Sequence, residues 1–286
     1  MTRPLLAAVD GSPESAVAAR WAADEARRRR LPLRLVHVRT WLDGLPGSPD
    51  VRALTDRMME LTERQINDTH PGLKIETSVV EADEPVEPLL RQAEAAELLV
   101  LGSRGLGGFT GLLLGSVGLA TAARCEIPTV LVPAGSAERP GLPDQPEVVV
   151  GVDTSAPDPT VLEFAFREAA LRGATLRAVH AWAVPPVWGY ARGVAPENGL
   201  EQFRALEREL LTDALTGWRE KYSQVELVED SRVGPAPAVL RDLSVGAALL
   251  VVGRRRRSHR AGMHLGPVAH AVLHHTPIPV AVVPHD

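Results

Sequence analysis

Glycine and serine residues between positions 97 and 133 form the part of this chain best suited to hold a charged ligand. They follow the pattern G-x2-G-x9-G-S, carried by Gly102, Gly105, Gly115 and Ser116. An apolar run that predicts a buried strand precedes the pattern, and a predicted helix opens at its end. Glycine lets backbone N–H groups approach a phosphate closely, and a helix N-terminus presents unpaired N–H donors with partial positive charge. The stretch therefore predicts an anion site.

The spacing differs from two common phosphate-binding motifs. A P-loop needs G-x4-G-K-[ST], and no lysine stands near this loop. A dinucleotide fingerprint needs G-x-G-x-x-G directly after the first strand, where it is absent. A glycine-rich surface connection without any ligand is the alternative interpretation.

Asp10 follows the first predicted strand, at a position where burial is expected. Its carboxylate could accept a hydrogen bond from an adenine amino group or a ribose hydroxyl, or it could cap the next helix, with Ser12 as the other candidate cap. Val38, at the end of the second strand, could form an apolar floor for a base or belong to the core.

The chain repeats itself. LLAAVDGSPESA, at residues 5–16, returns as EVVVGVDTSAPDPT at 147–160, and IPTVLVP, at 127–133, returns as IPVAVVP at 278–284. Asp10 corresponds to Asp153, and His37 corresponds to His180. An insertion of about eight residues is expected in the loop at 184–199. We therefore predict two copies of one fold, at 1–133 and 147–286, joined by a Pro/Gly-rich linker at 134–146.

Each copy alternates apolar strands with helical patterns. In the first copy, strands are predicted at 5–9, 33–38, 73–80, 98–101 and 129–132, with helices from Ser12-Pro13, at 51–69, at 86–96 and from Gly115. This order predicts an α/β fold of two tandem doubly wound parallel-sheet domains, with strand order 3-2-1-4-5. Asp10 and Gly102 then meet at the topological switch point, where such sheets bind ligands.

The composition is that of a globular protein with length for roughly two domains. It is 45% hydrophobic and 23% charged, with a net charge of −5. The single cysteine, Cys125, rules out an intramolecular disulfide and is expected as a small buried hydrophobe. No apolar run approaches the roughly 18 residues of a membrane span, and no signal peptide is expected before Asp10. We expect a cytoplasmic protein without nucleic-acid or membrane partners, and interpret the arginines at 27–30 as a solvated helix end.

These motifs resemble the universal stress protein family. The resemblance rests on V-D-G-S after the first strand, H-V at the end of the second, the glycine pattern and the terminal I-P-T-V-L-V-P strand, and it covers both halves. It implies a tandem member that binds an adenine nucleotide, ATP in many members, in which Asp10 and Val38 contact the base or ribose. It also implies that domains pair through their last strands, at 129–132 and 279–283, within the chain and in a homodimer. The implied first-half site comprises Asp10, Gly11, Ser12, Val38, Gly102, Arg104, Gly105, Gly115, Ser116 and Val117.

The second half departs from this pattern. Gly253 and Gly266 remain, but Arg256 replaces the middle glycine and Pro267 replaces the serine. Proline has no N–H and no hydroxyl, although it suits the first turn of a helix. We expect this site, with Asp153, Gly253 and Gly266, to bind ATP weakly or not at all, while the arginines at 254–257 could compensate in part through their charge.

Other constellations are weaker. His270, His274 and His275 lie on a predicted helix at a spacing that can ligate zinc, but no acidic partner shares the turn, so no metal site is predicted. Trp188 and Tyr190 lie in the inserted loop and could cover a ligand or belong to an ordinary surface loop.

The function predicted from the sequence is that of an ATP-binding stress-response or regulatory protein rather than an enzyme. ATP is the expected cofactor, and Mg²⁺ can accompany its phosphates. Three alternatives stay open: a slow ATPase, an interaction scaffold that works without nucleotide, and a sensor of AMP or a cyclic adenine nucleotide.

Overall fold

The computed structural model describes residues 2–40, 49–103, 114–135, 146–184, 199–256 and 265–286. The first half contains β1 (Leu5–Ala8), α1 (Pro13–Arg29), β2 (Leu33–Arg39), α2 (Pro49–Thr69), β3 (Ile75–Glu81), α3 (Val86–Ala93), β4 (Leu98–Gly102), α4 (Ser116–Arg124) and β5 (Thr129–Val132). The second half contains β6 (Glu147–Gly151), α5 (Pro159–Arg172), β7 (Thr175–Trp182), α7 (Gly199–Lys221), β8 (Leu227–Val233), α8 (Ala236–Leu243), β9 (Leu249–Arg255), α9 (Pro267–His275) and β10 (Val280–His285).

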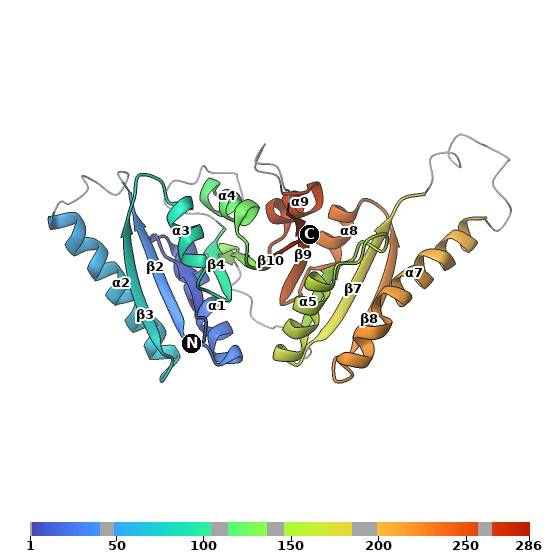
Figure 1. Cartoon of the computed structure of the whole chain (residues 1–286), viewed down its shortest axis with the longest axis horizontal. Coiled ribbons are helices and arrows are strands. Elements are labelled where there is room, and N and C mark those ends of the chain that lie inside the picture. Colours follow the sequence, from blue (N-terminus) through green and yellow to red (C-terminus); the bar gives the residue numbers. More distant parts are fainter. Residues whose placement is uncertain (1, 41–48, 104–113, 136–145, 185–198, 257–264) are drawn as a thin grey trace.

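All ten strands form one sheet, in the order β3-β2-β1-β4-β5-β10-β9-β6-β7-β8. Each half has the predicted order 3-2-1-4-5 and is parallel within itself, which confirms the predicted fold class. The halves lie side by side, with β3 at one end of the molecule and β8 at the other (Figure 1).

The last strands of the two halves join the sheets. β5 and β10 pair antiparallel, with Val130 opposite Ala281. Each of these strands also pairs with a strand of its own half, β5 with β4 and β10 with β9. Both of their edges are therefore occupied within one chain, and a homodimer would have to form through other surfaces.

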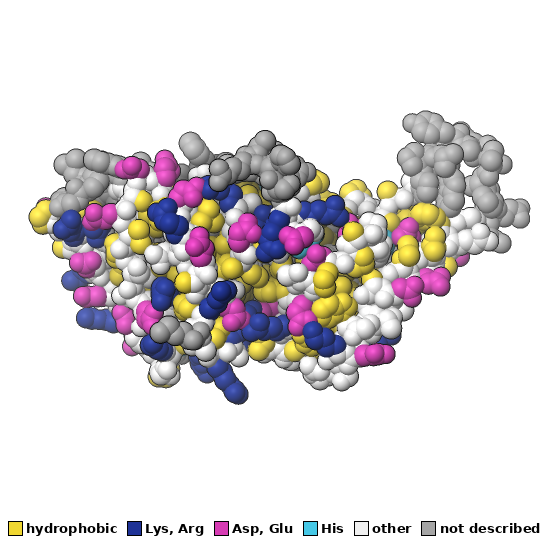
Figure 2. Space-filling model, in the orientation of Figure 1, with side chains coloured by type: hydrophobic (Ala, Val, Ile, Leu, Met, Phe, Trp, Pro, Cys, Tyr) yellow, Lys and Arg dark blue, Asp and Glu magenta, His cyan; other side chains and the backbone are white. Residues whose placement is uncertain are grey.

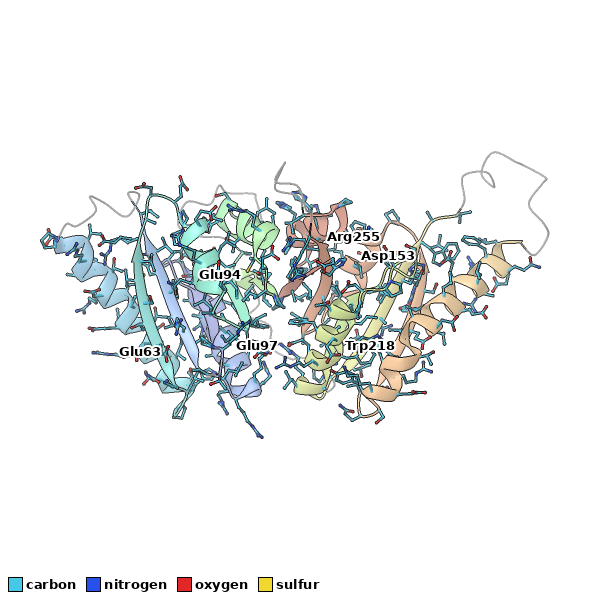
Figure 3. All side chains as sticks on the ribbon, viewed as in Figure 1. Glu63, Glu94, Glu97, Asp153, Trp218 and Arg255 are labelled. Carbon is cyan, nitrogen blue, oxygen red and sulfur yellow. The ribbon has the colours of Figure 1, made fainter. Side chains whose placement is uncertain are left out.

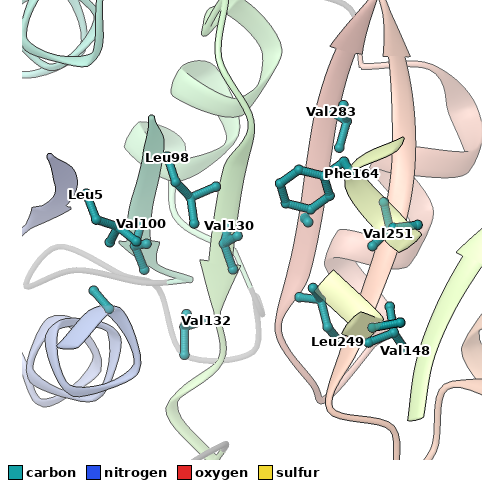
Figure 4. Packing of buried hydrophobic residues seen from close by; sticks show 14 of the residues in the cluster. Leu5, Leu98, Val100, Val130, Val132, Val148, Phe164, Leu249, Val251 and Val283 are labelled. Atoms are coloured by element: carbon teal, nitrogen blue, oxygen red, sulfur yellow. The ribbon is translucent and has the colours of Figure 1, made fainter. Parts of the chain in front are cut away.

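Two apolar layers flank the sheet, one on each face. One layer packs α1, α2, α5 and α7 against the strands, through residues such as Ala22, Ile66 and Phe166, and the other packs α3, α4, α8 and α9. Figure 4 shows part of the first layer, with Leu98 and Val130 in one half and Phe164 and Val283 in the other. Each layer continues across β5 and β10, so both layers contain residues of both halves.

Local signals in the sequence explain how α1 begins and ends. Ser12 is the N-cap and accepts a hydrogen bond from the Ser15 N–H, and Pro13 follows at the first helical position. The helix ends at Arg30, which has a left-handed φ of 56°, and the equivalent end of α5 has Gly173 with φ 58°. The arginines at 27–29 lie in the last turn, where cations suit the helix dipole. The expected solvated end is wrong for Arg29, whose side chain is 2% exposed because it pairs with buried glutamates.

A buried quartet of charges connects α1 to α5. Arg29 Nε donates to Glu25 Oε1 at 2.6 Å, and Arg172 Nη2 donates to Glu25 Oε2 at 2.7 Å. Glu168 accepts from both arginines. All four side chains are at most 5% exposed. Burial opposes ionisation of Glu25, yet Arg172 and Arg29 together hold its pKa below the usual value.

The quartet follows the internal repeat, because Glu25 and Arg29 lie 143 residues before Glu168 and Arg172. The aromatic neighbours repeat as well: Arg29 lies over the Phe164 ring and Arg172 over Trp21, each 5.8 Å from the ring centroid. Each half therefore contributes a glutamate, an arginine and an aromatic residue at equivalent positions to the contact between α1 and α5.

Charges of both signs intermingle on the face of the molecule that Figure 2 shows. Among the helices of the described residues, none has the length and hydrophobicity that spanning a bilayer would require.

Replacing Arg172 by methionine tests the quartet. The change leaves Glu25 and Glu168 buried with one guanidinium between them, so we expect the free energy of unfolding to fall by about 3–5 kcal/mol. The control is Arg208→Met on α7, whose ion pair with Glu201 is exposed and should contribute below about 1 kcal/mol. Urea unfolding of the three proteins measures both effects, and equal midpoints for the two variants would contradict the account.

Candidate functional site

Asp10 forms a tight turn directly after β1. Its Oδ1 accepts from the Ser12 N–H at 3.0 Å and from the Ser12 hydroxyl at 2.5 Å. Of the two residues that the sequence offered as caps, Ser12 caps α1, and Asp10 instead makes an Asx turn with Ser12. Gly11 has φ 83°, a backbone conformation that favours glycine, and a Cβ there would lie 2.9 Å from Met58 Sδ on α2 and would have to displace that side chain.

The second half repeats the turn but not the cap. Asp153 Oδ1 accepts from the Ser155 N–H at 3.1 Å and from its hydroxyl at 2.5 Å. The N-cap of α5 is instead Asp158, which accepts from the N–H groups of Thr160 and Val161. The shared feature is the oriented carboxylate, which makes that carboxylate the first candidate for contact with a ligand in both halves.

In each half, a histidine donates a hydrogen bond to the backbone at the end of the first strand, next to the aspartate. His37 Nδ1 donates to the Val9 carbonyl at 2.7 Å, and His180 Nδ1 donates to the Val152 carbonyl at 3.2 Å. Both rings are buried. The repeat pairs these histidines in the sequence, but no periodicity predicts that they bond to the neighbouring strand. Val38, next to His37, is half-buried and packs against the core layer of α3 and α4.

The ends of the glycine pattern lie beside this turn. β1 pairs with β4 in parallel register, with Ala7 opposite Val100. Asp10 and Gly102 therefore lie at the same edge of the sheet, the one formed by the carboxyl ends of the strands. The Gly115 N–H donates to the Ser103 carbonyl at 2.6 Å and closes the base of the loop. Arg104 and Gly105, predicted to belong to this site, lie outside the described residues.

The first turn of α4 has no side-chain cap among the described residues. Gly115 is the N-cap and supplies no side chain to the first N–H groups; Ser116 is exposed and Val117 is half-buried. Gly118 allows α4 to pack closely, because a Cβ there would lie 3.3 Å from Leu131 and 3.6 Å from the Gly102 carbonyl. A helix start of this kind can hold an anion through backbone N–H groups.

In the second half, the corresponding edge contains a cavity of about 900 Å³. Asp153, Gly253 and Gly266, the three second-half residues predicted from the sequence, all line it. The structure therefore brings these predicted residues together. It also places His285, which the sequence analysis did not single out, in the wall of the cavity.

Two of the arginines expected to compensate in the second half bond to the first half instead. Arg254 Nη2 donates to the Cys125 carbonyl, and Arg256 Nε donates to Glu126 Oε2 at 2.7 Å. Both acceptors lie between α4 and β5. The Arg256 side chain thus ties the halves together. Arg255 reaches Asp153, at 3.7 Å (Figure 3), and Arg257 lies outside the described residues.

Neither the cysteine nor the histidines of α9 form a metal centre in the described part of the chain, where no group of three or more His, Cys, Asp or Glu side chains gathers. Burial raises the pKa of the Cys125 thiol, as suits the buried hydrophobe that was predicted. Burial, together with the charges of His270 and His275, lowers the pKa of His274. Trp188 and Tyr190, the candidate lid residues, lie outside the described residues.

Comparisons with known proteins agree across both halves. The family model described as "Universal stress protein family" matches residues 1–133 and 146–284. A universal stress protein of Mycobacterium tuberculosis H37Rv, Rv2005c, is 33% identical over 294 residues, which cover 96% of this chain and 94% of that protein. Among solved structures, a universal stress protein from Archaeoglobus fulgidus has a TM-score of 0.64 at 19% identity, with 100% of each chain covered. A protein of unknown function from Pseudomonas aeruginosa PAO1 has a TM-score of 0.68 at 17% identity, covering 100% of this chain and 93% of that one.

Ser12 caps α1 and also bonds to Asp10, and alanine substitutions at Ser12 and Ser155 separate these two roles. Ser12→Ala removes a helix cap and a bond to Asp10, so we expect the free energy of unfolding to fall by about 1–2 kcal/mol. Ser155→Ala is the matched control, because it removes only the bond to Asp153 and should cost less. Thermal and urea unfolding measure both, and a greater loss for Ser155→Ala would contradict the assignment.

Proposed function

The chain belongs to the universal stress protein family, and from this premise we propose that it is a regulatory protein that binds an adenine nucleotide, ATP, in its first half. The single observation that carries the proposal is the placement of the Asp10 turn and the first turn of α4, which has no side-chain cap, at the carboxyl ends of β1 and β4, the switch point of the sheet.

The two parts of this edge suit the two parts of a nucleotide. The Asp10 carboxylate, oriented by Ser12, is an acceptor for the hydroxyl or amino groups of a nucleoside. Val38 offers apolar surface for the base, and the N-terminus of α4 offers N–H donors for phosphate. In this proposal Gly102, Arg104 and Gly105 lead the chain around the phosphates.

We propose binding and regulation rather than catalysis. Asp10 Oδ1 already accepts two hydrogen bonds from Ser12, which suits the carboxylate to hold a ligand rather than to take a proton from water. Mg²⁺ can accompany ATP through the phosphates and water, with few protein ligands. Incubation of the purified protein with Mg-ATP should accordingly yield no steady release of ADP.

Two substitutions at Ser116 test the first-half site. Ser116→Pro removes an N–H and a hydroxyl at the first position of α4 while proline still fits there, so we expect ATP to bind about tenfold or more weakly. Ser116→Ala keeps the N–H and should weaken binding less. Calorimetric titration of nucleotide-free protein with Mg-ATP measures both affinities. Wild-type affinity in a folded Ser116→Pro protein would contradict the phosphate assignment.

A further inference from the structure

The cavity of the second half keeps the features suited to a nucleoside. Asp153 has the same turn as Asp10, with Ser155 in the role of Ser12. Apolar side chains from three elements line the remainder, among them Val179 on β7, Leu240 on α8 and Val252 on β9. A volume of about 900 Å³ lies within the range of small-molecule sites. The space and the oriented acceptor for a nucleoside are therefore both present.

The same cavity has lost donors where phosphates would bind. Pro267 stands at the first position of α9, where the first half has Ser116, so one backbone N–H and one hydroxyl are missing. Arg256, in the place of Gly105, does not supply its guanidinium to the cavity, because that group bonds to Glu126 and to Asp286. Both differences reduce the binding of a polyphosphate.

His285 occupies part of the space beside the glycine. It is the last residue of β10, and its Nδ1 lies 3.3 Å from Oδ2 of Asp158, the N-cap of α5. Its Nε2 lies 2.8 Å from where a Cβ on Gly253 would be. The corresponding residue of the first half is Ala134, which follows Pro133 as His285 follows Pro284. An imidazole ring therefore covers Gly253, although a glycine there would otherwise let phosphates approach the backbone.

Among the described residues around the cavity, one exposed arginine remains for a small anionic group. Arg255 and Asp153 lie 3.7 Å apart, and both side chains are 61% exposed. Exposed pairs at such a distance hold weakly, so a nucleoside can displace Arg255 from Asp153 and leave it to meet a single phosphate. Arg254 also lines the cavity but is 5% exposed; its Nη2 donates to the Cys125 carbonyl, and its Nε has no hydrogen-bond partner among the described residues, so it can add one N–H to the same small anionic group.

We propose that the second half binds an adenosine ligand with no more than one phosphate, so that one chain holds two different adenine compounds. The choice of adenine rests on the proposed function of the first half. The preference for a short ligand rests on Pro267, Arg256 and His285, and all three residues belong to the second half.

Titration of the Asp10→Ala protein, whose first half has lost the acceptor for a nucleoside, isolates the second site. We expect adenosine and AMP to bind at one site per chain. ATP should bind at this site at least about tenfold more weakly than AMP. In the wild-type protein, AMP added after saturation with Mg-ATP should fill one further site. Asp153→Ala should abolish that second uptake and leave the first-half binding of ATP intact.

A second variant should restore ATP binding in the second half by giving it residues of the first half. His285→Ala combined with Pro267→Ser gives the second half the residues that the first half has at these positions, and should raise its affinity for ATP about tenfold or more. Equal binding of ATP and AMP by the unmodified second site would overturn the proposal, as would the absence of any adenine ligand there in folded protein. The proposed function of the first half is tested separately: if the Asp153→Ala protein bound no ATP, that proposal would be wrong.

Discussion

The antiparallel pairing of β5 with β10 is the interaction on which the arrangement of the whole chain depends. It turns two five-stranded sheets into one, and it makes each apolar layer continuous across the middle of the molecule. It also occupies the edges of both last strands, which would otherwise be open to pair with another chain. Because the sheet is covered on both faces, the residues that meet at this junction are buried: Leu131, Val130 and Thr129 on one side lie opposite Val280, Ala281 and Val282 on the other.

Two polar contacts fix how the halves meet around that junction. On one face of the sheet, the quartet of Glu25, Arg29, Glu168 and Arg172 pairs each buried charge with charges of the other half. On the other face, Arg254 and Arg256 reach the segment between α4 and β5. Buried charges are costly unless each is paired, so these contacts favour one arrangement of the halves over others that would leave a charge unpaired. The quartet repeats residue for residue, whereas the arginine contacts come from one half only.

That asymmetry explains how two copies of one fold come to have different sites. Both halves keep the strand order, the Asx turn and the histidine that bonds to the end of the first strand, because these features belong to the fold. The residues of the glycine pattern contribute less to the buried core, so substitutions among them disturb the fold less. In the second half its middle glycine has become Arg256, which contacts the first half, and its serine has become Pro267, which still starts a helix. Loss of phosphate donors is thus compatible with an unchanged fold.

The sequence by itself determined the alternation of strands and helices, the repeat, the start of α1 at Ser12-Pro13 and the strand order, because periodicity, capping and the handedness of crossovers are local or topological rules. Small differences remain at element ends: α3 ends at Ala93 rather than at 96, and β3 begins at Ile75 rather than at 73. Only the tertiary structure decided which partners distant side chains take. Arg256 could bond to a phosphate or to Glu126, and His285 could point to solvent or over Gly253. These choices depend on residues more than 30 positions away, which the folded sheet brings together and no local pattern encodes.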